Sequence, residues 1–102
     1  MSLPELPIIL SVEARDDLIE ISLYGLASRG EDIANRYAAD LQDALRHIAR
    51  FPGLGRVKEG EAANVRVLRH DQHVIYYEAH SDSIVILRVL HTRMDATHYL
   101  DF

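Results

Sequence analysis

The spacing of apolar residues changes along the chain from a helical to a strand-like period. Residues 13–28 and 31–50 repeat apolar side chains at helical spacing, which predicts two helices separated by a stop at Arg29-Gly30. The short apolar run at residues 7–12 precedes them and predicts a first strand. The first half of the chain is therefore expected to form a strand followed by a helical hairpin.

The first predicted helix carries more apolar surface than one contact needs. One stripe consists of Ala14, Leu18, Ile21 and Gly25, and a second consists of Ile19, Leu23 and Leu26, with Tyr24 beside it. A helix that covers one face of a sheet needs about one such stripe. The second stripe therefore either packs against the following helix or forms a partner-binding surface.

The second half of the chain has the pattern of three strands joined by short turns. Residues 65–69, 73–79 and 84 onwards are rich in β-branched and aromatic residues, with turns at 70–72 and 81–83 and a polar loop at 56–64. The last run is almost continuously apolar, which is typical of a central strand. Arg88 interrupts this run and must pair with an acid from a helix or a partner. The order β-α-α-β-β-β predicts an α+β fold, with the helical hairpin packed on a small, mainly antiparallel sheet.

Composition narrows the class of protein. The 102 residues suit a single domain, 1–102, with no cysteine for disulfides or thiol chemistry. No apolar run approaches the roughly 20 residues of a membrane span, and no signal peptide is evident, so we expect a cytoplasmic protein. A net charge of −5 argues against direct, sequence-specific nucleic-acid binding.

Basic and histidine side chains in the second half are the candidates for chemistry. Arg66, Arg69, His91 and Arg93 are expected to approach one face of the sheet, where arginine binds phosphate and histidine can act as a general acid or base on ribose. The alternative for Arg93 is a local ion pair with Asp95. Four histidines could suggest a metal site, but no Asp or Glu is clearly placed to complete a set of ligands with them. They are His70, His73, His91 and His98, and neither a metal site nor a cofactor is expected.

The residues Arg88-Val89-Leu90-His91-Thr92-Arg93-Met94-Asp95 resemble a motif of the RelE/ParE superfamily of bacterial toxins, in its ParE branch. Further similarity covers nearly the whole chain, including Ala14, Asp17-Leu18 and 21–24, Pro52-x-x-Gly55-Arg56, Arg66-x-Leu68 and 73–77. The resemblance implies the same α+β layout of a helical hairpin on a small sheet. The turn at 70–72 departs from the family, which often has glycine with a basic neighbour there.

The resemblance also implies a function. A ParE-like toxin of a type II toxin–antitoxin system inhibits DNA gyrase, is not itself a hydrolase, serves plasmid stabilisation and is neutralised by a cognate ParD-like antitoxin with a ribbon-helix-helix DNA-binding part. The expected target-binding residues are Arg66, Arg69, His91 and Arg93, and the expected antitoxin-binding residues are Ile19, Leu23, Tyr24, Leu26 and Arg88.

Two other functions remain open at this point. One is a RelE-like, ribosome-dependent mRNA endoribonuclease with Arg66, Arg69 and His91 as catalytic residues. Two features weigh against it, because Lys58 is the only lysine and the chain has Arg-Met-Asp where RelE-like chains more often place a catalytic tyrosine. The other is an inactive relative that only binds an antitoxin.

Overall fold

The structure is a computed structural model that describes residues 4–60 and 64–100. Its elements are β1 (Ile8–Leu10), α1 (Val12–Arg29), α2 (Glu31–Arg50), β2 (Arg56–Val57), β3 (Val65–His70), β4 (His73–Ala79), β5 (Ile84–His91) and the 3₁₀ turn η1 (Ala96–His98). The predicted order of strands and helices is confirmed. The two-residue strand β2 was predicted as loop, because two residues are too few to show a strand pattern.

The five strands form one mixed sheet in the order β1-β5-β4-β3-β2. Strands β2 to β5 pair antiparallel, whereas β1 runs parallel to β5. The last strand is central, as its apolar sequence predicts, since β1 and β4 flank it. Its pairing with β4 shifts by one residue at Leu87, where Tyr76 pairs with Arg88 but Tyr77 pairs with Ile86.

Local capping explains where the helices begin. Ser11 Oγ accepts a hydrogen bond from the Ala14 amide at 2.9 Å and donates one to the Leu87 carbonyl at 2.7 Å, so one hydroxyl caps α1 and ties it to β5. Gly30 separates the two helices in a conformation with φ of 88°, which a glycine adopts without strain. The predicted bounds of α2 coincide with the observed ones.

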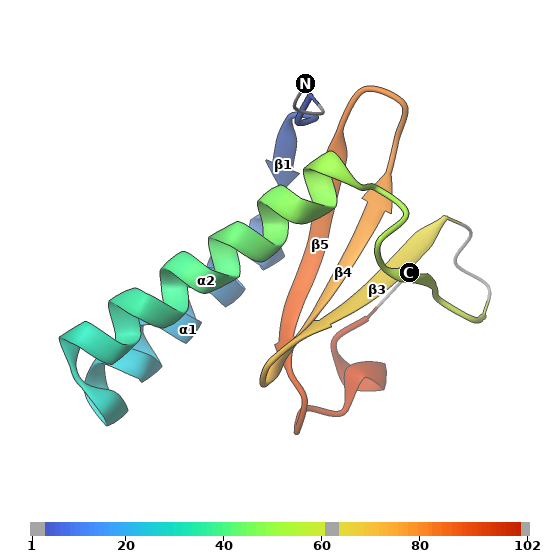
Figure 1. Ribbon diagram of the computed structural model, residues 1–102. Coiled ribbons are helices and arrows are strands. Elements are labelled where there is room, and N and C mark those ends of the chain that lie inside the picture. The colour runs from blue at the N-terminus through green and yellow to red at the C-terminus, as the bar shows by residue number, and fades with distance from the viewer. Residues whose placement is uncertain (1–3, 61–63, 101–102) are drawn as a thin grey trace.

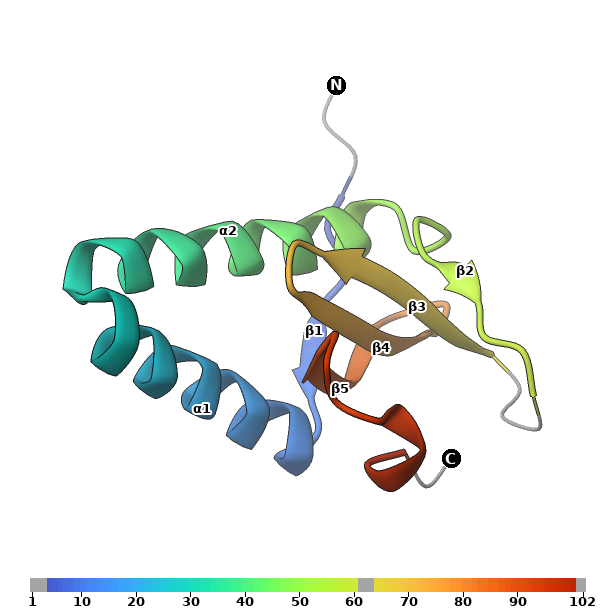
Figure 2. The same cartoon turned by 90° about the horizontal axis from the view of Figure 1, so that it is seen from below.

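The helical hairpin covers one face of the sheet only (Figure 1; Figure 2). The main core lies in this contact and comes from the C-terminal half of α2, the start of α1 and the inward residues of β4 and β5. Its fully buried members include Ile48, Ile75, Tyr77, Ile84 and Ile86. The joined ends of the two helices extend beyond the edge of the sheet, so part of the hairpin has no sheet beneath it (Figure 1).

The second apolar stripe of α1 does not pack against α2. Ile19, Leu23, Tyr24 and Leu26 are between 49% and 74% exposed, whereas Leu18 and Ile21 of the first stripe pack into the core. Of the two alternatives for this stripe, packing against the following helix is wrong. The first stripe makes the contact with the core, and the hairpin extends past the sheet, so the other stripe remains on the surface.

Candidate functional site

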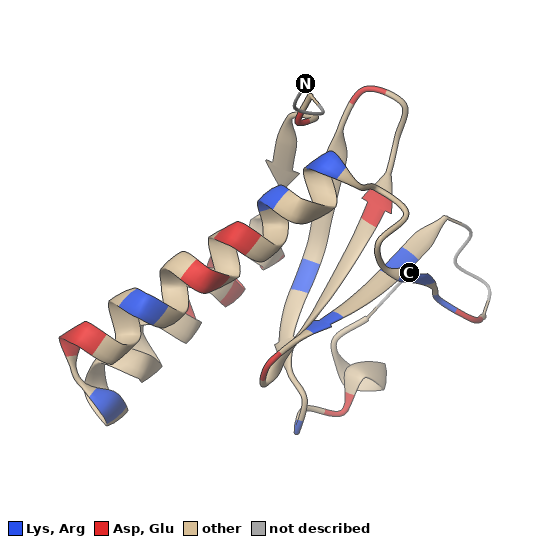
Figure 3. Ribbon diagram, viewed as in Figure 1, with Lys and Arg blue, Asp and Glu red and all other residues tan. Residues whose placement is uncertain are grey.

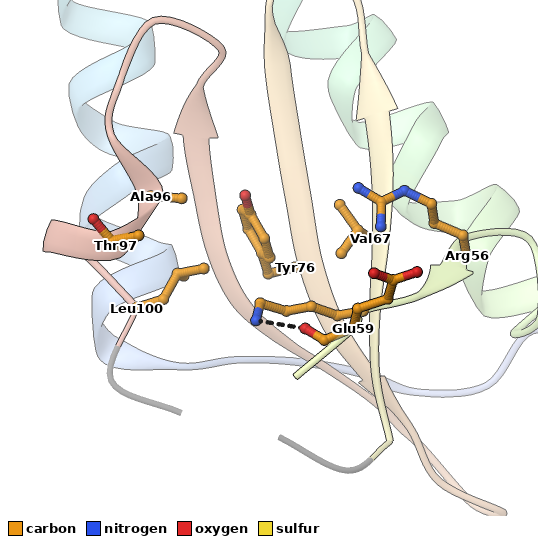
Figure 4. Close-up of a pocket in the computed structure, with 8 residues that line it drawn as sticks. Arg56, Glu59, Val67, Tyr76, Ala96, Thr97 and Leu100 are labelled. Carbon is orange, nitrogen blue, oxygen red and sulfur yellow. Dashed lines mark hydrogen bonds between the residues drawn. The ribbon is translucent and has the colours of Figure 1, made fainter. Parts of the chain in front are cut away.

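The face of the sheet opposite the helices is only partly covered. Val67, Tyr76 and Leu90 form a second, smaller cluster there, and Ala96 and Leu100 of the C-terminal segment pack on it. We call this surface the open sheet face. A hollow of about 410 Å³ lies on it, bounded on one side by β2 and on the other by the C-terminal segment, with the Tyr76 ring between them (Figure 4). The lining side chains are Arg56, Lys58, Glu59, Val67, Tyr76, Ala96, Thr97 and Leu100.

The two arginines of β3 lie on opposite faces of the sheet. Arg69 pairs with Val74, whose side chain packs on the open sheet face, whereas Arg66 pairs with Tyr77, which belongs to the core under the helices. Successive side chains of a strand alternate between faces, so a spacing of three residues already predicts this separation. The expectation that these arginines approach one face with His91 is therefore not met.

Both arginines are engaged within the chain. Arg66 Nη1 donates to the Gly55 carbonyl at 2.7 Å, and Arg69 Nε donates to the Asp71 carbonyl at 3.1 Å. Arg66 thus supports the loop after α2, and Arg69 supports the turn between β3 and β4. These contacts give both residues a structural role in addition to the predicted role in target binding.

The Tyr77 hydroxyl also holds the loop after α2 in place. It donates to the Pro52 carbonyl and accepts the Gly55 amide, both at 2.8 Å, and burial raises the pKa of the phenol. A side chain at Gly55 would collide with the Tyr77 ring and with the Val67 carbonyl, each 2.9 Å away. The spacing Pro52-x-x-Gly55 is the sequence signal for this contact, because it brings a carbonyl and an amide to one hydroxyl.

Three histidines lie side by side across the end of the sheet. His70 pairs with His73, and His73 pairs with His91, so we call these residues the histidine rung. The His73 and His91 rings meet edge to face at 5.3 Å, and Tyr37 of α2 hydrogen-bonds His73 Nδ1. Sequence reasoning did not find Tyr37, which looked like an ordinary member of the apolar stripe of α2.

The fold favours the neutral form of His73. Its pKa is lowered because burial penalises the charged ring, and neighbouring His91 and His70 lower it further, while Asp71 acts in the opposite direction. The unfolded chain therefore binds a proton more readily than the folded chain. This contribution to stability is complete above the unfolded pKa of about 6.5 and is lost as the pH falls from there towards the folded pKa.

His91 and Arg93 lie together where β5 ends. The Arg93 amide donates to His91 Nδ1 at 3.0 Å, and the Arg93 side chain is exposed. Among the described residues, Asp95 accepts hydrogen bonds from Thr97 and forms an ion pair with His98. The alternative prediction of an ion pair between Arg93 and Asp95 is therefore wrong. Asp95 instead begins η1, the helical turn expected in the C-terminal tail.

Arg88 pairs with an acid from a helix, which confirms one of its two expected partners. Its guanidinium makes a bidentate contact with the Asp17 carboxylate, both hydrogen bonds at 2.8 Å, and Asp17 also accepts the Val89 amide. A further guanidinium nitrogen donates to the Tyr99 carbonyl at 2.9 Å. Arg88 therefore connects α1, β5 and the C-terminal segment. The structure thus gives Arg88, which is predicted to bind the antitoxin, partners within the chain.

The acidic side chains are distributed unevenly over the fold. Among the described residues, most of the acidic side chains lie on α1 and α2 (Figure 3).

In residues 4–60 and 64–100, no three histidine or carboxylate side chains are arranged to hold a metal ion. Nor does this part of the chain contain a helix with the length and apolar character that crossing a membrane requires.

Comparisons of the sequence with known proteins point to one family. The family model described as the ParE toxin of the type II toxin–antitoxin system parDE matches residues 8–96. The ParE1 toxin of Caulobacter vibrioides is 35% identical over 94 residues, which cover 92% of this chain and 97% of that toxin. The ParE1 toxin of Mycobacterium tuberculosis is 32% identical over 72 residues, covering 70% and 74% of the two chains.

Solved structures share the fold. A chain from the chromosomal ParDE toxin–antitoxin system of Pseudomonas aeruginosa superposes with a TM-score of 0.72 at 18% identity, over 85% of this chain and 96% of that one. A chain from the RelBE2 complex of Mycobacterium tuberculosis gives 0.64 at 23% identity, over 86% and 99%. With the family model matching most of the sequence and a ParE toxin aligned over almost its full length, this chain belongs to the ParE toxin family of type II toxin–antitoxin systems.

Proposed function

We propose that this ParE toxin acts in the cytoplasm as an inhibitor of DNA gyrase and that it does not itself hydrolyse RNA. The observation that carries this proposal is the separation of Arg66, Arg69 and His91. Arg66 points to the helix side of the sheet and Arg69 to the open sheet face, so the three residues are not arranged to act on one ribose. Inhibition of a protein target needs only an exposed patch, and His91 and Arg93 lie together at the surface end of β5.

A paired assay tests this proposal. Purified toxin is incubated with gyrase, ATP and relaxed plasmid, and in parallel with ribosomes and mRNA. We expect supercoiling to be blocked while the mRNA stays intact, and we expect Arg93→Ala to weaken the inhibition by at least about tenfold, as loss of a central arginine contact does in protein interfaces. Cut mRNA with normal supercoiling would instead establish the endoribonuclease function, and no effect in either assay would identify an antitoxin-binding relative without these activities.

The cognate partner in this proposal is a ParD-like antitoxin with a ribbon-helix-helix DNA-binding part. The support is family membership together with the exposed apolar stripe of α1, made of Ile19, Leu23, Tyr24 and Leu26. These side chains repeat at helical spacing along α1, towards the end that is joined to α2. An amphipathic helix of the antitoxin can cover such a stripe with side chains spaced in the same way.

Leu23→Asp tests this contact. Leu23 is 60% exposed, so the substitution is expected to leave the fold intact and to weaken antitoxin binding by at least about thirtyfold, the effect of losing an apolar anchor. The measurement is the Kd by titration calorimetry with the antitoxin encoded beside the toxin. Leu54→Asp is the matched control, because Leu54 is 49% exposed but belongs to the loop between α2 and β2 and not to α1. Equal losses for both variants would contradict the assignment.

A further inference from the structure

The ring of His91 closes a tight turn at the end of β5. Its Nδ1 accepts the Arg93 amide at 3.0 Å, and its carbonyl accepts the Met94 amide at 2.9 Å. The bond from the side chain of one residue to the amide two positions later is the one that asparagine and aspartate make in Asx turns. The side chain of His91 therefore holds the backbone of Arg93 in position.

Only a neutral His91 can make this bond. A neutral imidazole has one donor and one acceptor nitrogen, whereas both nitrogens of the charged ring are donors. Here Nδ1 faces an amide that must donate, so the proton of the neutral ring is on Nε2, which lies 3.4 Å from Gln72 Oε1. Protonation places a second proton on Nδ1, opposite the Arg93 amide, and removes its acceptor.

The surroundings of His73, the middle residue of the rung, disfavour a positive charge on its ring. The ring centroids of His73 on β4 and His91 on β5 are 5.3 Å apart. His73 is buried and is hydrogen-bonded to Tyr37 of α2. The Tyr37 ring centroid lies 6.1 Å from that of His70 on β3. Burial and the neighbouring histidines lower the pKa of His73. Asp71 in the adjoining turn acts in the opposite direction and raises the pKa of His73. Two charged rings at this distance would repel each other.

We propose that His91 is a positioning residue for Arg93 and that protonation of His91 releases the hydrogen bond that holds the backbone of this arginine. Neutral His91 holds the backbone of the exposed Arg93 at the end of β5, and the charged form frees the Arg93 amide while the backbone hydrogen bonds of Thr92 and Met94 remain. Histidine is the side chain whose charge state changes most readily near neutral pH, so a pH titration tests this turn directly. The consequence for gyrase rests on the proposed function, because there Arg93 contacts the target.

Amide hydrogen exchange at Arg93, followed by NMR and corrected for the intrinsic exchange rate, tests the inference. We expect the protection of the Arg93 amide to be about fivefold lower at about pH 5.5 than at about pH 7.5. A decrease of this size corresponds to the net loss of one hydrogen bond. In His91→Asn, the asparagine oxygen takes the place of Nδ1 and cannot be protonated, so protection should be retained at both values. In His91→Leu, protection should be low at both.

His80→Gln is the control, since His80 is an exposed histidine at the opposite end of the same pair of strands. It should keep the pH response of the unmodified protein. Protection of Arg93 that does not change with pH in the unmodified protein, or that changes equally in His91→Asn, would overturn the inference. A pH response at Arg93 in a protein that does not inhibit gyrase at neutral pH would overturn the proposed function and leave the positioning role of His91 in place.

Discussion

Replacing Arg88 with leucine is expected to lower the free energy of unfolding by about 3–5 kcal/mol, the usual cost of removing one partner from a buried ion pair. The side chains of Arg88 and Asp17 are only 17% and 13% exposed, so solvent screens their interaction weakly. The substitution leaves the Asp17 carboxylate without its bidentate partner and takes a donor away from the Tyr99 carbonyl. Urea denaturation followed by circular dichroism measures the loss.

A second substitution identifies the cause of this loss. Asp17→Asn in the Arg88→Leu background removes the unpaired charge but keeps an oxygen to accept the Val89 amide. We expect it to restore about 1–2 kcal/mol, because an unpaired buried carboxylate costs more than an amide. If Arg88→Leu lowers stability by less than about 1 kcal/mol, the pair behaves as a surface salt bridge and the expectation is wrong.

Gly55→Ala is expected to destabilise the protein by about 2–3 kcal/mol through overpacking. The added methyl group would lie 2.9 Å from both the Val67 carbonyl and the Tyr77 ring. The first is backbone of β3, and the second is fully buried and holds the loop through two hydrogen bonds, so neither can move cheaply. Thermal unfolding monitored by circular dichroism gives the change in stability.

Gly53→Ala is the matched control for this substitution. It lies two residues away in the same loop, has open space within 4 Å of the added methyl group and is not among the residues with positive φ. Its effect should stay within about 0.5 kcal/mol, as for other surface substitutions. Comparable losses in both variants would show that the loop as a whole, and not the contact with Tyr77, determines the effect.

The sequence by itself determined both helices and every strand except the two-residue β2. Helical spacing placed both helices, and the bounds predicted for α2 are the observed ones, since its apolar stripe is unbroken and the Phe51-Pro52-Gly53 segment ends it. The continuous apolar run of β5 predicted a strand flanked on both sides, and Arg88 within it predicted an ionic partner. These properties follow from local patterns of burial and charge, which the order of residues records directly.

The tertiary structure alone decided which distant residues meet. Asp17 is 71 positions from Arg88, and no local pattern distinguishes it from the neighbouring acids on α1. The parallel pairing of β1 with β5 and the hydrogen bond between Tyr37 and His73 depend in the same way on how the hairpin docks. The exposure of Leu23 and Tyr24 also depends on how the hairpin docks. An apolar stripe has the same sequence pattern whether a neighbouring helix covers it or solvent surrounds it.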